Sequence, residues 1–230
     1  VPNFQNPSGR SISAARRLAL VAQAAAVGLP ILEDNPYGEL WYDAPPPAPL
    51  AAAAGDGAIY LGSFSKVLAP GLRLGYLVAP KALYPKLLQA KQAADLHTPG
   101  FNQRIVHRVL ADGLLARHLP ALRARYRERR DAMAAALSRH LPAGCHWQLP
   151  AGGMFFWIEL PGRLDASALL APAVAAGVAF VPGSAFYCQV PRADRLRLSF
   201  VTVAPAQIDT GVAALAGVLA QALSAQEQTT

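Results

Sequence analysis

A serine-any-serine-lysine sequence ends at Lys66, directly after residues 59–61, whose apolar character is typical of a buried strand. A lysine at the end of a buried strand is costly unless its amine is paired or takes part in a reaction. If the strand continues, the Ser63 and Ser65 hydroxyls share one face and Lys66 points to the other. Arg73 comes seven residues later, and a guanidinium can hold a phosphate through two hydrogen bonds. These groups suit a ligand with an anionic tail and a reactive end, whereas Lys66 taken alone is explained more simply as an exposed loop lysine.

Two earlier turns place further polar groups at strand ends. Asp34 ends the strand-like residues 30–33, at a position where ligands of open α/β sheets gather. A carboxylate buried there needs a cationic partner, and Tyr37 offers a phenol one tight turn later. Asn6 lies in an Asn-Pro-Ser-Gly turn before the first predicted helix. Taken singly, each turn is also explained by its turn-forming residues, with Asp34 as a cap.

The elements that must hold these turns are short strands that alternate with helices over the first hundred residues. We predict a helix that begins at Ser11 or Ser13 and ends near Val27, before Gly28 and Pro30. We also predict strands at residues 30–33, 58–61 and 72–78, a helix at 81–92 and a proline-rich loop at 44–49. This alternation is typical of a largely parallel sheet that is covered by helices.

The second half of the chain has a different pattern. Residues 101–139 are rich in helix formers and broken only at Gly113 and Pro120, which predicts a long helix in two pieces. After Pro142 the pattern becomes α+β, with strands predicted at 146–148, 154–159, 178–181 and 196–200 and helices at 166–176 and 205–223. We therefore predict a partial large domain over residues 1–120 and a small C-terminal domain over residues 121–230.

Composition argues against several classes of function. The net charge is +7, but the densest basic run, residues 123–130, spreads its arginines around a helix together with Glu128. A solvated helix face explains this run better than a nucleic-acid patch, and aromatic residues are not interleaved with it. No apolar run is long enough to cross a bilayer, and the five histidines show no metal-ligand spacing. Two cysteines make no disulfide framework, which fits a reducing, cytoplasmic setting.

Three segments in this order are together more specific for one known family than any one of them is alone. They are Phe4-Gln5-Asn6-Pro7, Glu33-Asp34-Asn35-Pro36-Tyr37-Gly38-Glu39 and Tyr60-Leu61-Gly62-Ser63-Phe64-Ser65-Lys66. Residues 70–76, 152–157 and 182–186 match as well. Over essentially all 230 residues the chain resembles fold-type I pyridoxal-phosphate (PLP) enzymes of the class I/II aminotransferase family, most closely the bacterial branch of 2-aminoadipate and broad-specificity aminotransferases. The resemblance implies the C-terminal part of the α/β PLP-dependent transferase fold, with a partial, mostly parallel sheet and a smaller α+β domain.

The resemblance also implies roles for the residues in these turns. Lys66 would form the Schiff base with PLP and, once released by substrate, move the proton between the substrate Cα and the cofactor C4′. Asp34 would pair with the protonated pyridine nitrogen, which strengthens the ring as an electron sink. The other contacts would be hydrogen bonds to the phenolic oxygen of the ring, from Tyr37 and Asn6, and to the phosphate, from Ser63, Ser65 and Arg73.

Arg197 falls where the family binds the α-carboxylate of the substrate. Arg195 is a rival by geometry, because two residues at a spacing of two on a strand share a face. The position just before Leu198-Ser199-Phe200 favours Arg197. A plain surface-strand arginine is the alternative explanation.

The function implied is PLP-dependent transfer of an amino group between an L-amino acid and a 2-oxo acid, by a homodimer. Family members carry an earlier half of the large domain, which contains a phosphate-binding loop and an aromatic residue that stacks on the pyridine ring. Residues 1–230 contain neither feature. We therefore expect the chain to be a fragment that alone binds PLP weakly and has weak or no activity. The alternatives are a PLP-sensing effector domain of a MocR-type transcription regulator and a PLP enzyme of another reaction type, such as decarboxylation, β-elimination or synthase chemistry.

Overall fold

In the computed structural model, which describes residues 1–228, the chain divides into two compact units. The first unit contains residues 1–5 and 10–123, and the second contains residues 6–9 and the chain from Ala124 on. The division lies close to the boundary that the sequence suggested near residue 120. The assignment of residues 6–9 to the second unit has no counterpart in the sequence pattern.

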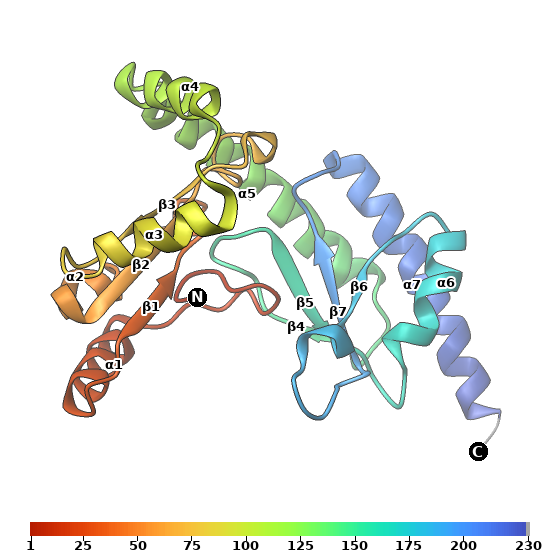
Figure 1. Ribbon diagram of the computed structural model, residues 1–230. Coiled ribbons are helices and arrows are strands. Elements are labelled where there is room, and N and C mark those ends of the chain that lie inside the picture. The colour runs from red at the N-terminus through yellow and green to blue at the C-terminus, as the bar shows by residue number, and fades with distance from the viewer. Residues whose placement is uncertain (229–230) are drawn as a thin grey trace. The chain divides into compact units, whose positions relative to one another are not determined.

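The first unit is built on a three-stranded sheet in the order β1-β2-β3, formed by β1 (Ile31–Asp34), β2 (Ala58–Ser63) and β3 (Gly75–Val78) (Figure 1). Strands β1 and β2 are parallel, but β2 and β3 are antiparallel. The expectation of a mostly parallel sheet is therefore met by one of the two pairings. The reason is the short connection over residues 64–74, because a parallel return requires a crossover of about a dozen residues or more, usually with a helix.

Helices of the first unit begin and end largely where local signals place them. Helix α1 spans Ala14–Ala26, and the hydroxyl of Ser13 caps it by accepting the N–H of Arg16. Gly28 ends the turn with a φ of +64°, a conformation that glycine adopts at little cost. The short helix α2 (Leu50–Ala54) was not predicted because it follows the proline-rich loop. Helices α3 (Tyr84–Asp95) and α4 (Gly100–Ala111) complete the unit.

Helix α5 spans Leu114–His140 and contributes to both units. The predicted break at Gly113 separates it from α4, and Gly113 has a φ of +64°. The second predicted break is wrong, because Pro120 lies inside α5. A proline removes one helical hydrogen bond, and near the start of a 27-residue helix the remaining bonds carry the helix past it.

The second unit contains a fully antiparallel sheet in the order β4-β5-β7-β6. Its strands are β4 (His146–Trp147), β5 (Phe155–Glu159), β6 (Val181–Pro182) and β7 (Arg195–Ser199). The strand predicted at residues 178–181 is largely wrong. The N–H of Val178 bonds to the carbonyl of Ala173 at 2.9 Å, so this residue closes the end of helix α6 (Ala166–Ala175) instead of pairing with a strand.

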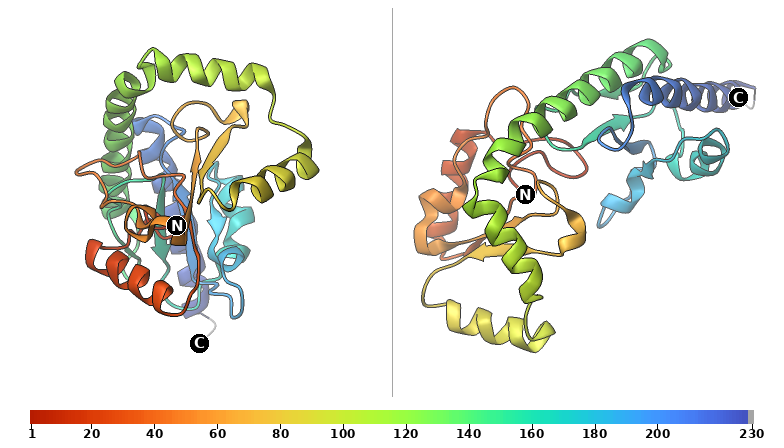
Figure 2. Two further views of the ribbon diagram at one scale, coloured as in Figure 1. Left: turned by 60° about the vertical axis from the view of Figure 1, so that its left-hand side comes forward. Right: turned by 90° about the horizontal axis from the view of Figure 1, so that it is seen from above.

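The core of the second unit lies where β5 and β7 alternate their side chains. Phe156 and Ile158 of β5 are buried, and Phe156 meets Phe200 edge-on with ring centroids 5.7 Å apart. Helix α7 (Pro205–Glu227) buries residues on one face, at the spacing of an amphipathic helix: Ile208, Val212, Leu215, Ala216 and Leu219. In Figure 2, α7 is the dark blue helix that leads to the C-terminus.

Helix α7 has the length and hydropathy of a membrane-spanning helix. Among the described helices it is the one that is long and apolar enough to cross a membrane, with a mean hydropathy of 1.4. The prediction that no apolar segment is long enough to cross a bilayer is therefore corrected for α7. Asp209 forms an ion pair with Arg139 at 2.8 Å and lies at hydrogen-bond distance, 3.0 Å, from His140 at the end of α5. One buried face and a charged contact to a neighbouring helix are features of an amphipathic helix that packs on a protein core, and 28% of the apolar window of α7 is buried.

Candidate cofactor and carboxylate sites

The carboxyl ends of β1 and β2 lie at the same edge of the sheet because the two strands are parallel. Asp34, the last residue of β1, stands opposite Leu61, and the ladder continues for one further bond, from the N–H of Asn35 to the carbonyl of Leu61 at 3.0 Å. Asp34 is exposed, whereas Tyr37 is buried with 7% of its surface accessible. The turn after Asp34 and the turn after Ser63 are therefore neighbours at this edge.

The turn that carries Lys66 begins at Ser63. The Ser63 hydroxyl accepts the N–H of Ser65 at 3.1 Å, and the carbonyl of Phe64 accepts the N–H groups of Leu68 and Ala69. The strand therefore ends at Ser63, two residues beyond the predicted end at residue 61, and does not continue through Lys66. A serine side chain that bonds to a main-chain N–H two residues ahead competes with the strand and favours a turn. Lys66 lies within this turn and is half-buried.

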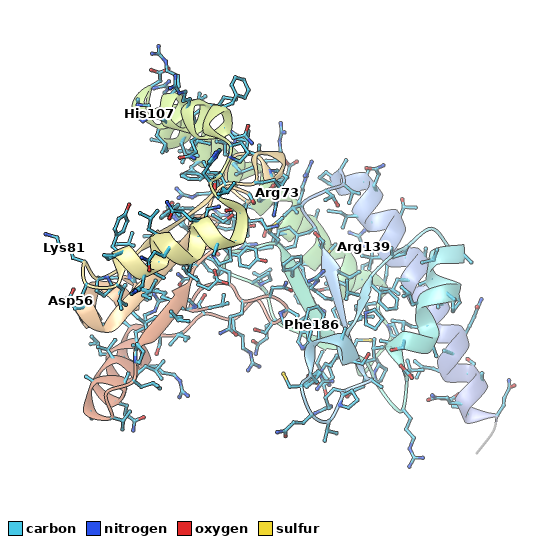
Figure 3. All side chains as sticks on the ribbon, viewed as in Figure 1. Asp56, Arg73, Lys81, His107, Arg139 and Phe186 are labelled. Atoms are coloured by element: carbon cyan, nitrogen blue, oxygen red, sulfur yellow. The ribbon has the colours of Figure 1, made fainter. Side chains whose placement is uncertain are left out.

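Arg73 is brought to the same turn by the antiparallel pairing of β2 and β3. Ser63 pairs with Gly75, and the N–H of Phe64 bonds to the carbonyl of Leu74 at 3.1 Å. Arg73 has a left-handed backbone with a φ of +50°, is exposed, and donates to the carbonyl of Pro70 at 3.1 Å (Figure 3). The main chain thus gathers two hydroxyls, an amine and a guanidinium on neighbouring segments. This donor set suits an anionic group such as phosphate, and the primary amine suits an aldehyde.

Asn6 and Arg197 come together in the second unit although 191 positions separate them. Nη1 of Arg197 donates to Oδ1 of Asn6 at 2.6 Å. The guanidinium lies over the ring of Phe155 at 4.2 Å and faces the ring of Phe186 at 5.2 Å; Phe186 is labelled in Figure 3. Cation–π contacts of this kind orient an arginine without neutralising its charge.

The neighbouring Arg195 has different partners. Its guanidinium forms ion pairs with Asp194 at 2.8 Å and with Glu159 at 3.0 Å. A hydrogen bond from Arg192 and the charge of Arg195 lower the pKa of Asp194, against the effect of burial. Two carboxylates therefore engage Arg195, and the guanidinium of Arg197 contacts the amide oxygen of Asn6 and two aromatic rings. The ion pairs of Arg195 count against it as the ligand of an added carboxylate.

Phe155 and Phe186 were missed as site residues. Both lie in segments, 152–157 and 182–186, that matched the family without being given a role. A usable signal was the aromatic content of these segments near the predicted carboxylate arginine. Trp157 continues the aromatic cluster, because its ring meets that of Phe186 edge-on at 5.6 Å.

A cavity of about 660 Å³ in the first unit borders the Lys66 turn. Its walls include Ser63, Phe64 and Tyr76, with apolar residues from the ends of α4 and α5. Burial, followed by the neighbouring Tyr60, raises the pKa of Tyr76. Of the predicted cofactor residues, Ser63 lines this cavity. Within residues 1–228, no group of three histidine, cysteine, aspartate or glutamate side chains could hold a metal ion.

Comparison with known proteins identifies the family. The family model described as aminotransferase class I and II matches residues 1–215. The chain belongs to this family. It is 43% identical to the aromatic-amino-acid aminotransferase 1 of Thermococcus litoralis, over 94% of this chain and 52% of that protein. The crystal structure of LysN, an alpha-aminoadipate aminotransferase from Thermus thermophilus complexed with N-(5'-phosphopyridoxyl)-L-leucine, is 42% identical, with a TM-score of 0.93 over 97% of this chain and 58% of that chain.

Family membership confirms the resemblance found in the sequence, and the fold is the α/β aminotransferase fold. The chain spans about half the length of the curated relatives it matches. One of these relatives is a regulator: the chain is 33% identical to the uncharacterized HTH-type transcriptional regulator YisV of Bacillus subtilis, over 94% of this chain and 44% of that protein. The two aminotransferases named above, at 43% and 42% identity, are more similar to the chain than this regulator is.

Proposed function

We propose that this chain belongs to a PLP-dependent aminotransferase, an enzyme that moves an amino group between an L-amino acid and a 2-oxo acid. The observation that carries the proposal is the Lys66 turn. Hydrogen bonding of β2 to β3 places Ser63, Lys66 and Arg73 on adjoining segments, at the sheet edge where β1 ends with Asp34. This donor set fits PLP, which has a phosphate, an aldehyde and a basic ring nitrogen.

PLP, when bound, supplies the electron sink that makes the Cα proton of an amino acid removable. The chain supplies the groups around it. The amine of Lys66 holds the cofactor and then takes and returns the proton at the substrate Cα. The carboxylate of Asp34 favours the protonated form of the ring nitrogen, because an opposite charge nearby stabilises a cation. The Tyr37 phenol, and the Asn6 amide by resemblance, donate to the phenolic oxygen of the ring.

Ser63, Ser65 and Arg73 bind the phosphate of the cofactor. Two hydroxyls donate single hydrogen bonds, and the guanidinium of Arg73 adds charge-assisted ones. Arg73 is exposed and bonded to a carbonyl in this structure, so its charge remains available to an anion.

Arg197 binds the α-carboxylate that amino-acid and 2-oxo-acid substrates share. Its hydrogen bond to Asn6 and its contact with Phe155 hold the guanidinium in one orientation, which lowers the entropy lost when a carboxylate binds. The names of the relatives make aromatic amino acids and 2-aminoadipate the first substrates to test.

Covalent trapping in the complete gene product tests the proposal. After incubation with PLP, borohydride reduction followed by peptide mass spectrometry is expected to find the phosphopyridoxyl group on Lys66. Lys66→Ala is expected to abolish the adduct and the visible absorption band. Single-turnover incubation with L-phenylalanine or L-2-aminoadipate is then expected to convert the cofactor to its amine form. If wild type forms no adduct at any lysine, the proposal is wrong.

A PLP-sensing regulator domain is the second candidate, and the likeness to the regulator YisV favours it. Both candidates predict the adduct on Lys66, but they differ in turnover. An enzyme is expected to transfer amino groups through repeated cycles when a 2-oxo acid is supplied. A protein that binds PLP at Lys66 and shows no sustained transfer with a panel of amino and 2-oxo acids supports the regulator.

Assembly and location complete the proposal. We infer a homodimer, as is usual in the family, and light scattering on the purified protein measures it directly. A cytoplasmic location is supported by two free cysteines, Cys145 and Cys188, because secreted domains usually pair theirs. Fractionation of cells that produce a tagged protein checks the location.

A further inference from the structure

Arg17 in helix α1 is a buried cation, with 3% of its surface exposed. A guanidinium has five N–H groups, and each one in Arg17 has an acceptor. The acceptors are the main-chain carbonyls of Ile12, Pro47, Ala48 and Pro2, at 2.8–3.4 Å, and the side-chain oxygen of Asn3. Burial lowers the pKa of Arg17, and the charge of Glu33 opposes that shift. Arg17 is therefore a fully bonded, fixed point inside the first unit.

A chain of side-chain hydrogen bonds leads from this point to the candidate cofactor site. Asn3, 1% exposed, accepts from Arg17 at Oδ1 and donates from Nδ2 to Oδ1 of Asn35 at 2.9 Å. Asn35 in turn donates from Nδ2 to the hydroxyl oxygen of Tyr60 at 2.9 Å. Each amide accepts at its oxygen and donates from its nitrogen, so the bonds run in one direction. Bonds arranged in this way polarise and strengthen one another.

Asn35 is held at more points than its two amide bonds. Its N–H extends the parallel ladder by bonding to the carbonyl of Leu61 at 3.0 Å. Gly38 leaves room for the amide, because a Cβ at that position would lie 2.4 Å from Nδ2 of Asn35. The main chain and the side chain of Asn35 are therefore both fixed in position.

The far end of the chain is a pair of phenols. The rings of Tyr60 and Tyr76 have centroids 6.3 Å apart, and Tyr60 contributes, after burial, to the raised pKa of Tyr76. Tyr60 lies on β2. The series of hydrogen bonds therefore joins α1, the N-terminal segment, the turn after β1 and the neighbouring strand β2.

We propose that Asn35 is a positioning residue for the cofactor site, and that the chain from Arg17 through Asn3 to Tyr60 holds it in place. The inference rests on the proposed function. Asn35 directly follows Asp34 and precedes Tyr37 by two residues, so its fixed position sets where the carboxylate leaves the strand and where the turn to the phenol begins. Hydrogen bonds weaken steeply with misalignment, and a displaced Asp34 changes the charge that stabilises the ring nitrogen.

The test compares Asn3→Ala, Tyr60→Phe and the double variant in the complete gene product reconstituted with PLP. The readout is the pH titration of the absorption band of the bound cofactor, together with PLP affinity by equilibrium dialysis. Each single variant is expected to move the titration midpoint by about half a unit or more and to weaken PLP binding about tenfold, the effect of losing roughly one hydrogen bond. The double variant is expected to add little, because both changes interrupt one chain.

Ser13→Ala is the matched control. The substitution removes the cap of the same helix that carries Arg17 and lowers stability, but the Ser13 side chain takes part in none of these hydrogen bonds. It is expected to leave the titration at the wild-type midpoint. If it moves the midpoint as far as the test variants do, lost stability explains the effect and the inference fails.

The remaining outcomes separate the inference from the proposed function. A folded Tyr60→Phe protein that forms the Lys66 adduct and titrates like wild type overturns the positioning role alone. Fully additive shifts in the double variant also overturn it, because they show two independent effects. A wild-type protein without any lysine adduct overturns the proposed function and this inference together.

Discussion

Replacing Arg17 by methionine is expected to destabilise the first unit strongly, although the residue is a charged side chain on a helix. Methionine keeps the helix propensity and an unbranched side chain, but it is shorter and removes five N–H donors. Five acceptors then lose a hydrogen bond from Arg17, four of them main-chain carbonyls, and the carbonyl of Pro2 keeps its bond from the N–H of Ile12 at 2.8 Å. Each buried acceptor left without a partner costs about 1–3 kcal/mol, and relief from burying a cation returns part of the total. We expect a net loss of about 3–5 kcal/mol, the range observed when a buried charged network is broken.

Urea unfolding at pH 7 measures this loss. Circular dichroism follows the helices, and tryptophan fluorescence reports Trp41 of the first unit, which packs under the guanidinium of Arg123 at 4.0 Å, together with Trp147 and Trp157 of the second. Two compact units can unfold separately, so the curve is fitted with two transitions where the probes disagree. Arg16→Met is the matched control, because Arg16 is the preceding, exposed residue of the same helix and the charge change is identical. It is expected to change stability by less than about 0.5 kcal/mol.

Equal effects of the two substitutions would refute the reasoning. If Arg17→Met and Arg16→Met agree to within about 0.5 kcal/mol, the hydrogen bonds of Arg17 do no more than offset the cost of burying its charge, as is known for some buried ion pairs. The hydrogen-bond chain to Asn35 would then lack a firm anchor.

Three further predictions concern packing and thiol chemistry. Gly62→Ala is expected to lower stability by about 1–3 kcal/mol, because the added Cβ would lie 2.2 Å from the ring of Tyr76; an unchanged urea midpoint would contradict this contact. Gly217→Ala in α7 is expected to raise stability by up to about 1 kcal/mol, since no described atom beyond its own helical surroundings lies within 4 Å of the new methyl; a lower midpoint would count against it. Iodoacetamide at pH 8 is expected to alkylate exposed Cys188 well before Cys145, whose pKa burial raises from 9.0 to about 11; peptide mass spectrometry showing equal rates would disprove the difference. Because that pKa is raised in the folded state, the contribution of Cys145 to stability is complete below about pH 9 and is lost as the pH rises through about 11.

Local signals were sufficient wherever an element depends on its own residues. Ser13 caps α1 as its side-chain chemistry suggests, and Gly113 separates α4 from α5 in a left-handed conformation that favours glycine. The order of the turn residues around Asp34 and Lys66 led to the family before any coordinates. Local reasoning did not decide where the strand before Lys66 ends; the Ser63 hydroxyl bonds to the main chain of the turn that begins there.

What the sequence determined by itself was therefore the helix and strand pattern of most segments, the family, and the types of residue at the candidate site. The tertiary structure alone decided which distant groups meet. Helical spacing does not reveal that Arg17 is buried while the adjacent Leu18 is 63% exposed, nor that Asn6 bonds to Arg197 from 191 positions away. The physical reason is that caps and turns are satisfied by atoms a few residues apart, whereas a buried cation or amide is satisfied by whichever acceptors the folded chain brings within about 3 Å.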